Sequence, residues 1–332
     1  MSLLRFVGLV SLLFATACSQ NEPKQALSPP PSSSAVESLR VCTGTSYSIL
    51  LSIADQKGLF AKEGLDVEIK PFAIGRDALE AMLAGNCDVA TSADTPVADY
   101  GIKRADLRVI AGIAKSDKLC YIVVRKATGI RKIADLQGRI VGVTKGTAPH
   151  FFLDLMLNKQ RLIEQDLKIK FMKGEELHQA FRDGILAAIS TTDLNAHKLQ
   201  EELGDAVELI SEPGLVLNHG YLTTLDATLG RKQNALKMLL AGVRSAEQLV
   251  AAKPDEARRL FASYLKVSPP VADRVWANIT PRLALEPAMI LTLEDNARWL
   301  HERDGGKSLH KSFKEIIKPE LLQLVAPDCV RF

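Results

Sequence analysis

The sequence lacks the residue patterns that most catalytic and metal sites require. Its 5 cysteines and 6 histidines show no zinc-site spacing, and there is no Gly-x-Ser-x-Gly motif, Cys and His cluster or carboxylate pair. Lysine and arginine are scattered and leave a net charge of only +3, so no nucleic-acid surface is indicated. We therefore expect no enzyme activity, no cofactor, no metal and no nucleic-acid partner.

Apolar runs long enough to cross a membrane are also missing beyond the N-terminus. There, Arg5 precedes an apolar run from Phe6 to Phe14 that is too short for a mature transmembrane helix. The run ends in Ala15-Thr16-Ala17-Cys18, which is typical of a lipoprotein processing site where Cys18 takes a diacylglyceryl group. An ordinary cleaved signal is the alternative. Because serine follows the cysteine, we expect a periplasmic lipoprotein anchored to the outer membrane of a two-membrane host.

Composition divides the chain into two N-terminal segments and a folded remainder. Residues 1–18 are predicted to be the signal, and residues 19–38, rich in Pro, Ser, Gln and Asn, a flexible tether. The remaining chain, from Leu39 to Phe332, is long enough for two lobes of ordinary size.

Four cysteines remain if Cys18 is acylated: Cys42, Cys87, Cys120 and Cys329. An oxidising compartment would permit up to two disulfides among them. Cys42 and Cys87 lie in or beside predicted neighbouring strands, so a bridge between them is possible, and buried free thiols are equally compatible with the sequence.

Hydrophobic periodicity predicts alternating strands and helices. A helix ending at Gly58 is followed by the strand 65–69, and together with the strand 40–43 these form a strand, helix, strand unit. Similar units recur, and they predict an α/β fold whose mostly parallel sheets are covered by helices on both faces. The later elements are expected as strands at 87–91, 107–114, 119–124, 140–143, 167–171, 186–189 and 221–225, with only helices beyond Gly230.

Four hydroxyl-rich loops follow predicted strands, at residues 43–47, 91–96, 144–150 and 190–193. Ligands of open parallel sheets bind beyond the carboxyl ends of the strands, where helix N-termini offer free N–H groups to anions. For any single loop, helix capping is the simpler explanation; four such loops in two lobes favour a shared site. The predicted ligand contacts are Thr45, Ser46, Tyr47, Arg76, Ser92, Asp94, Thr95, Gly146, Thr147, Ala148, His150, Ser190, Thr191 and His219.

Several of these candidates have a structural alternative. A lone histidine such as His150 or His219 is commonly a structural hydrogen-bonding group, and Tyr47 is compatible with the core. Arg76 can pair with an anion in a bidentate manner, or it can be an exposed residue at a helix start.

Three phrases carry a resemblance to a known family. The run from Gly58 to Ile69, the triplet Asp94-Thr95-Pro96 and the phrase from Gly142 to His150 resemble the periplasmic substrate-binding proteins for sulfonates, taurine and nitrate. In that family, the residues matching Gly146, Thr147 and Ala148 open a helix that faces the ligand.

The resemblance implies a type II periplasmic-binding-protein clamshell. Residues 39–124 with 223–332 would form lobe 1, and residues 125–222 would form lobe 2. It also implies a monomer that captures a small anionic or polar organic molecule and delivers it to the permease and ATPase of an ABC importer.

The chain departs from the family after the strand 186–189. The family usually has an aspartate, a tryptophan, an acidic residue and a proline there, whereas this chain has Ser190, Thr191 and Thr192. The ligand therefore cannot be copied from better-known members, and a degenerate site is one alternative. The alternative functions are a ligand-sensing adaptor without transport, a binder of pyrimidines or thiamine precursors, and an enzyme on the same fold.

Overall fold

The structure is a computed structural model that describes residues 36–306 and 312–332. The predicted signal at 1–18, the lipid attachment at Cys18 and residues 19–35 of the predicted tether lie outside the described residues. Glu37 and Ser38, which we assigned to the tether, begin the first strand instead. In the described part, no helix combines the length and hydropathy needed to cross a bilayer.

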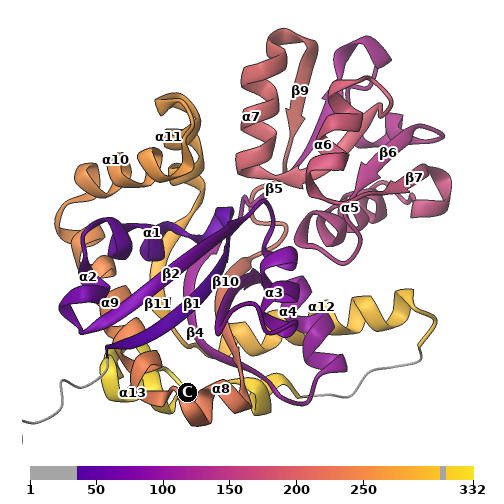
Figure 1. Cartoon of the computed structure of the whole chain (residues 1–332). Helices are drawn as coiled ribbons and strands as arrows, with labels where there is room; N and C mark the ends of the chain where they lie inside the picture. The colour runs from indigo at the N-terminus through magenta and orange to yellow at the C-terminus, as the bar shows by residue number, and fades with distance from the viewer. Residues whose placement is uncertain (1–35, 307–311) are drawn as a thin grey trace, which may run out of the picture. The chain divides into compact units, whose positions relative to one another are not determined.

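The described strands form two sheets with helices around each (Figure 1), which confirms the α/β class. The first sheet consists of β1 (Glu37–Gly44), β2 (Leu65–Phe72), β3 (Val89–Ala93), β4 (Leu107–Ser116), β10 (Asn218–Leu225) and β11 (Thr280–Ala284), in the order β11-β4-β10-β3-β1-β2. Its helices are η1 (Thr45–Tyr47), α1 (Ile49–Gln56), α2 (Leu59–Lys62), α3 (Gly75–Leu83), α4 (Asp94–Lys103), α8 (Asp226–Arg231), α9 (Gln233–Ala252), α10 (Pro254–Leu265), α11 (Pro269–Asn278), α12 (Pro287–Arg303), η6 (Phe313–Ile316), α13 (Glu320–Val325) and η7 (Pro327–Cys329).

The second sheet consists of β5 (Cys120–Arg125), β6 (Ile140–Val143), β7 (Lys168–Phe171), β8 (Ala188–Thr192) and β9 (Val207–Ile210), in the order β7-β6-β8-β5-β9. Its helices are η2 (Lys126–Thr128), η3 (Ile133–Leu136), α5 (Ala148–Lys159), η4 (Glu164–Asp166), α6 (Gly174–Arg182), α7 (Asp193–Leu203) and η5 (Gly204–Ala206).

The chain crosses between the sheets earlier than the sequence suggested. The strand β5 pairs with β8 and β9, and β10 pairs with β3 and β4. The crossings therefore lie at residues 117–119 and 211–217, whereas the expected lobe boundaries lay between residues 124 and 125 and between residues 222 and 223. Both strands are buried throughout most of their length, so periodicity could not show which sheet each of them joins.

Most strands of each sheet run in one direction, and each sheet also contains antiparallel pairs. The strand β1 runs parallel to β2 and β3, and β6 runs parallel to β7 and β8. In contrast, β10 and β5 run antiparallel to both of their neighbours. Each of these two strands directly follows a crossing. It therefore enters its sheet beside the carboxyl ends of the parallel strands and runs in the opposite direction.

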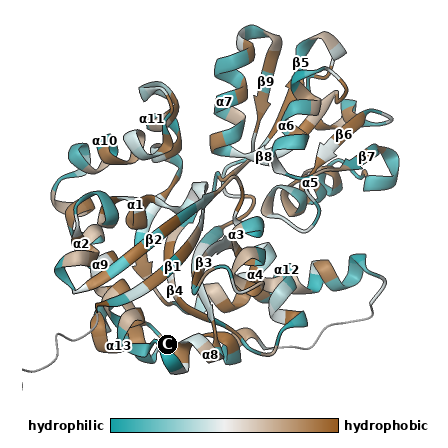
Figure 2. Ribbon diagram, viewed as in Figure 1, coloured by the Kyte–Doolittle hydropathy of each residue, from teal (hydrophilic) through white to brown (hydrophobic). Residues whose placement is uncertain are grey.

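Residue patterning explains the core. The glycine that we expected to end the first helix, Gly58, has a φ of 60° and lies between α1 and α2. Along β2, Leu65 is buried while Asp66 is exposed, whereas Val41 and Val89 in the central strands are fully buried. Figure 2 accordingly shows the central strands as mainly hydrophobic and several of the surrounding helices with alternating polar and apolar residues.

Two details depart from or complete the sequence analysis. Cys42 and Cys87 form a disulfide with Cα atoms 5.8 Å apart, while Cys120 and Cys329 are buried free thiols. The segment beyond Gly230 is not entirely helical, because Thr280–Ala284 forms β11 against β4. The prolines at 254, 269 and 287 do start helices, as expected from residues that lack an N–H to donate.

Candidate functional site

A cavity of about 60 Å³ lies where the strands β1, β3 and β8 end, and residues from both sheets line it. Gly44 ends β1, Thr91 to Ala93 end β3, and Ser190 to Thr192 end β8. This is the position in which open α/β sheets hold ligands. In this conformation the volume admits only a few water molecules, so a larger ligand requires the walls to move apart.

Five helices begin at this cavity. Gly75 and Gly174, the first residues of α3 and α6, line it, and so do the residues that precede α4, α5 and α7, which are Ala93, Thr147 and Thr192. Each helix has at least nine residues, and each directs its free N–H groups and partial positive charge toward the cavity. The arrangement suits an anionic or strongly polar group.

Two buried side chains in the lining have unused hydrogen-bonding capacity. Tyr47 Oη and Ser92 Oγ have no hydrogen-bond partner among the described residues, although the two residues are only 5% and 1% exposed. Burial, followed by the nearby Asp94, Cys120 and Asp193, raises the pKa of Tyr47 well above its usual value, so its hydroxyl remains protonated. Because an unpaired buried hydroxyl is costly, these two groups indicate a missing partner.

The hydroxyls supplied by the second sheet already have partners. Thr147 Oγ1 donates to the Thr144 carbonyl at 2.7 Å, and Ser190 Oγ donates to the Pro149 carbonyl at 2.7 Å. Thr191 Oγ1 lies 3.0 Å from Nε2 of His178. These oxygens keep free lone pairs, so they can still accept hydrogen bonds from a ligand.

Arg76 lines the cavity but is not a free cation. Its Nη2 lies 2.8 Å from Asp99 Oδ2, and its Nε lies 3.0 Å from Glu80 Oε1. Its Nη1 donates to the Gly146 carbonyl at 2.8 Å. Arg76 therefore connects α3 of the first sheet to the loop before α5 of the second.

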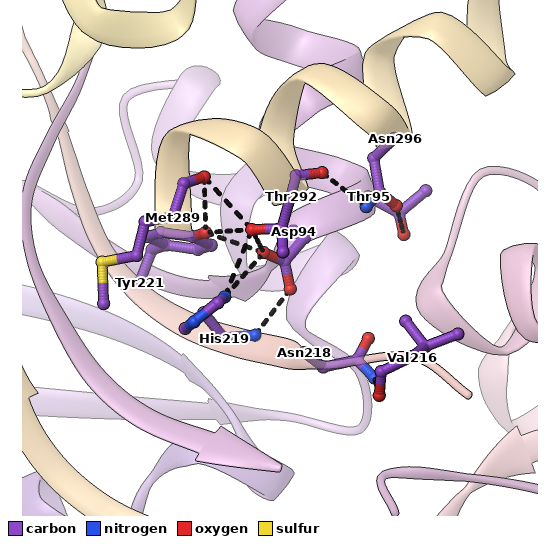
Figure 3. Close-up of polar contacts among 9 residues, drawn as sticks. All are labelled: Asp94, Thr95, Val216, Asn218, His219, Tyr221, Met289, Thr292 and Asn296. Carbon is purple, nitrogen blue, oxygen red and sulfur yellow. Dashed lines mark hydrogen bonds and ion pairs between the residues drawn. The ribbon is translucent and has the colours of Figure 1, made fainter. Parts of the chain in front are cut away.

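Asp94 is buried and lies outside the cavity lining, in a hydrogen-bond network with the buried His219 and Tyr221 and the partly buried Thr292 (Figure 3). Its Oδ2 accepts the His219 N–H at 2.6 Å, and its Oδ1 accepts from Tyr221 Oη at 2.7 Å and Thr292 Oγ1 at 2.9 Å. His219 Nδ1 lies 3.3 Å from the same oxygen. These contacts assign Asp94 and His219 to the packing of β10 and α12 against α4.

Four other candidates, Thr45, Thr95, Gly146 and His150, are not among the residues that line the cavity. Thr95 Oγ1 donates to Asn296 at 2.6 Å (Figure 3), and Thr45 Oγ1 donates to the Ala73 carbonyl at 3.2 Å. His150 is buried behind the loop that contains Gly146. The side chain of Ser46 lies outside the described part of the structure.

The structure therefore gathers Tyr47, Arg76, Ser92, Thr147, Ala148, Ser190 and Thr191 at one cavity. The sequence analysis placed Thr144 in a candidate loop without naming it as a contact, and it missed Gly174 and His178, which also line the cavity. The rule that ligands bind at strand ends would have found Gly174, because it follows β7 and begins α6. His178 lies one turn further along that helix, where no pattern in the sequence distinguished it.

A second buried carboxyl lies close to the cavity. Asp193 begins α7 directly after Thr192, and its Oδ1 accepts the Leu194 N–H at 2.7 Å, while Oδ2 has no partner among the described residues. Burial raises the pKa of Asp193 to about 8, so this carboxyl is mostly uncharged at neutral pH.

A family model described as NMT1/THI5 like matches residues 45–257. The chain belongs to this family. The match includes all the helices that begin at the cavity, and the resemblance that the sequence carried is thus confirmed.

Curated relatives cover most of the chain. A Brucella abortus protein, provisionally named as a binding protein, is 25% identical over 221 residues, 66% of this chain and 68% of its own length. A Haemophilus influenzae protein, provisionally named for thiamine biosynthesis, is 26% identical over 250 residues, 72% and 76% of the two chains.

Solved structures share the fold. The alkanesulfonate-binding protein of Xanthomonas axonopodis pv. citri, bound to MOPS, matches with a TM-score of 0.74 and 20% identity over 85% of this chain and 98% of its own. A desulfurization enzyme also matches, with a TM-score of 0.64 and 14% identity over 88% and 99% of the chains. The fold is thus that of periplasmic binding proteins, and the same fold also occurs in an enzyme.

Proposed function

We propose that this protein is an extracytoplasmic solute-binding protein that captures a small anionic or polar organic molecule in the cavity. The observation that carries the proposal is the pair of buried hydroxyls of Tyr47 and Ser92, which have no partner among the described residues and lie where five α-helices of the described chain begin. A ligand acceptor would satisfy both hydroxyls, and the helix N-termini would stabilise its negative charge. The proposed contacts are Tyr47, Ser92, Thr147, Ala148, Ser190 and Thr191.

The wider assignment follows from this role. We propose that the protein is a monomer, is attached to a membrane through Cys18 in the periplasm, and delivers its ligand to an ABC importer. The sulfonate-binding structural relative supports an oxyanion as the first ligand class to test. The Haemophilus relative named for thiamine biosynthesis supports a pyrimidine or thiamine precursor as the second.

Catalysis is not part of the proposal, although an enzyme shares the fold. Among the described residues that line the cavity there is no cysteine, lysine or carboxylate to serve as a nucleophile or base. His178 is buried, its pKa is lowered to about 4 mainly by burial, and it faces Thr191. Its neutral ring thus serves as a hydrogen-bonding group for the cavity wall.

A thermal-shift screen of the full chain tests the proposal. The panel comprises alkanesulfonates, MOPS, taurine, nitrate, nucleobases and thiamine precursors, each expected to stabilise the protein only if it binds the folded state. For each hit, the combined Tyr47→Phe and Ser92→Ala variant should raise Kd by about tenfold or more, because two hydrogen bonds are lost.

Tyr264→Phe is the matched control. Tyr264 Oη is also buried, but Tyr264 does not line the cavity, so this variant should keep the wild-type Kd. A hit that binds the double variant as tightly as the wild type would contradict the site, and a panel without any hit would count against both ligand classes.

A further inference from the structure

His150 holds the loop that leads into α5. We propose that His150 is a positioning residue that fixes the ligand loop, defined as Thr144 to Thr147, and connects it to α12 of the first sheet. The inference rests on the proposed function, because the ligand loop forms part of the cavity wall. It assigns to His150 a role behind the cavity, whereas the sequence suggested direct ligand contact.

Both backbone polar groups of Gly146 are held by side chains. Its N–H donates to Nδ1 of His150 at 3.0 Å, and its carbonyl accepts from Nη1 of Arg76 at 2.8 Å. Gly146 has a φ of 68°, and a Cβ added there would lie only 2.6 Å from Nη1 of Arg76. The loop thus adopts a conformation that only glycine fits readily, and two side chains maintain it.

The other ring nitrogen of His150 determines its tautomer. Nε2 lies 2.7 Å from Oε1 of Glu164, a carboxylate that can only accept, so the proton resides on Nε2 and Nδ1 is free to accept from Gly146. His150 is only 1% exposed, and the rings of Phe171 and Trp299 pack edge-on against it at 5.2 and 5.0 Å. The imidazole therefore has a fixed orientation.

Contacts beyond Glu164 lead to α12. Glu164 Oε2 lies 2.6 Å from Nη2 of Arg303, and Trp299 Nε1 donates to Asp154 at 2.9 Å. Trp299 and Arg303 belong to α12, which packs against α4, a helix that begins at the cavity. A continuous set of contacts thus runs from Gly146 through His150 and Glu164 to the first sheet.

Burial outweighs the nearby carboxylates and favours the neutral form of His150. Burial, the largest cause, lowers its pKa; Glu164 and Asp154 oppose that shift, and Arg303 supports it. A protonated ring would carry a hydrogen on Nδ1 and could not accept the Gly146 N–H. The ligand loop is therefore expected to keep its conformation down to pH values below the usual histidine pKa.

Two substitutions separate the halves of this role. In His150→Asn, the side-chain oxygen replaces Nδ1 and can still accept from Gly146, whereas the contact with Glu164 is lost. In His150→Gln, the longer amide can still donate to Glu164, whereas the acceptor for Gly146 is lost. His150→Phe removes both contacts and serves as the reference.

The test measures two quantities on the full chain. Amide hydrogen exchange at Gly146, followed by NMR, should stay within about threefold of wild type in His150→Asn and rise at least about tenfold in His150→Gln and His150→Phe. Binding of sodium ethanesulfonate and MOPS should weaken in the same order, by about five- to tenfold for the glutamine variant. Melting temperatures identify any variant that fails to fold, and the asparagine and glutamine pair still decides the outcome.

The outcomes distinguish the inference from the proposed function. Equal exchange at Gly146 in the asparagine and glutamine variants, or wild-type behaviour in both, would overturn the role of His150. If wild type binds a probe and His150→Gln binds it equally well, the inference fails while the proposed function stands. If wild type binds neither probe but the exchange order holds, the positioning role stands and the proposed ligand class fails.

Discussion

Each sheet contains a similar strand-to-helix junction, in which a strand leads directly into a helix that begins with aspartate, but the surroundings of the two junctions differ. In the first sheet β3 leads through Ser92 and Ala93 into Asp94 of α4, and in the second β8 leads through Thr191 and Thr192 into Asp193 of α7. Both aspartates are buried at the first residue of a helix. Asp94 accepts three close hydrogen bonds from β10 and α12, whereas Asp193 accepts one, from its own helix.

The difference shows how a repeated local pattern acquires different roles. The first junction is fixed by donors that arrive from distant parts of the chain, so its carboxylate serves the fold. The second junction lacks such donors, and its carboxyl avoids the cost of a buried charge by staying protonated. The first sheet is therefore predicted to contain the more strongly stabilised half of the site. Four measurements test this difference between the two sheets.

The largest expected effect concerns the disulfide between Cys42 and Cys87, which braces β1 of the first sheet. It closes a loop with a sequence separation of 45 residues, and the chain-entropy model assigns such a loop about 4 kcal/mol of stability. Replacing both cysteines by serine should lower the free energy of unfolding by about that amount in urea titrations. Cys329→Ser is the single-thiol control, and a double variant within about 1 kcal/mol of it would contradict the bracing role.

The next effect concerns Asp94 itself. Asp94→Ala would leave the His219 N–H and the Tyr221 and Thr292 hydroxyls without their acceptor, so we expect a loss of about 3 kcal/mol. Asp193→Ala removes a single local bond and should cost about 1 kcal/mol. Chemical denaturation of both variants measures the contrast, and equal losses would remove the distinction between the junctions.

Sequence reasoning found the fold class because strand and helix periods and the helix end at Gly58 are local features. It also named several of the hydroxyl residues that line the cavity, since their positions at strand ends follow from chain direction alone. It could not identify the partners of Asp94, because Tyr221 and Thr292 are 127 and 198 residues away in the chain. The crossings were misplaced for the same reason, since sheet membership depends on distant pairing.

The third effect is a pH dependence. The pKa of Asp193 is about 8 in the folded state against an ordinary 3.8, so folding retains a proton that the unfolded chain releases. Its contribution to stability is complete below about pH 3.8 and is lost as the pH rises toward 8. Asp193→Asn cannot ionise, so above pH 8 it should be more stable than wild type by about 1 to 3 kcal/mol.

Thermal unfolding from pH 4 to 9 measures this difference. The two proteins should converge near pH 4 and separate as the pH rises. A wild-type protein whose stability relative to Asp193→Asn does not change with pH would show that Asp193 is already ionised, and the contrast with Asp94 would lose its electrostatic basis.

The smallest effect compares the hydroxyls that precede the two aspartates. Thr191→Val leaves Nε2 of buried His178 without its partner and should cost about 1 kcal/mol in unfolding free energy. Ser92→Ala removes a buried hydroxyl that has no partner in the described structure, so it should leave the stability of the ligand-free protein unchanged or raise it, while weakening ligand binding. If Ser92→Ala destabilised the ligand-free protein more than Thr191→Val, the Ser92 hydroxyl would serve the fold rather than the ligand.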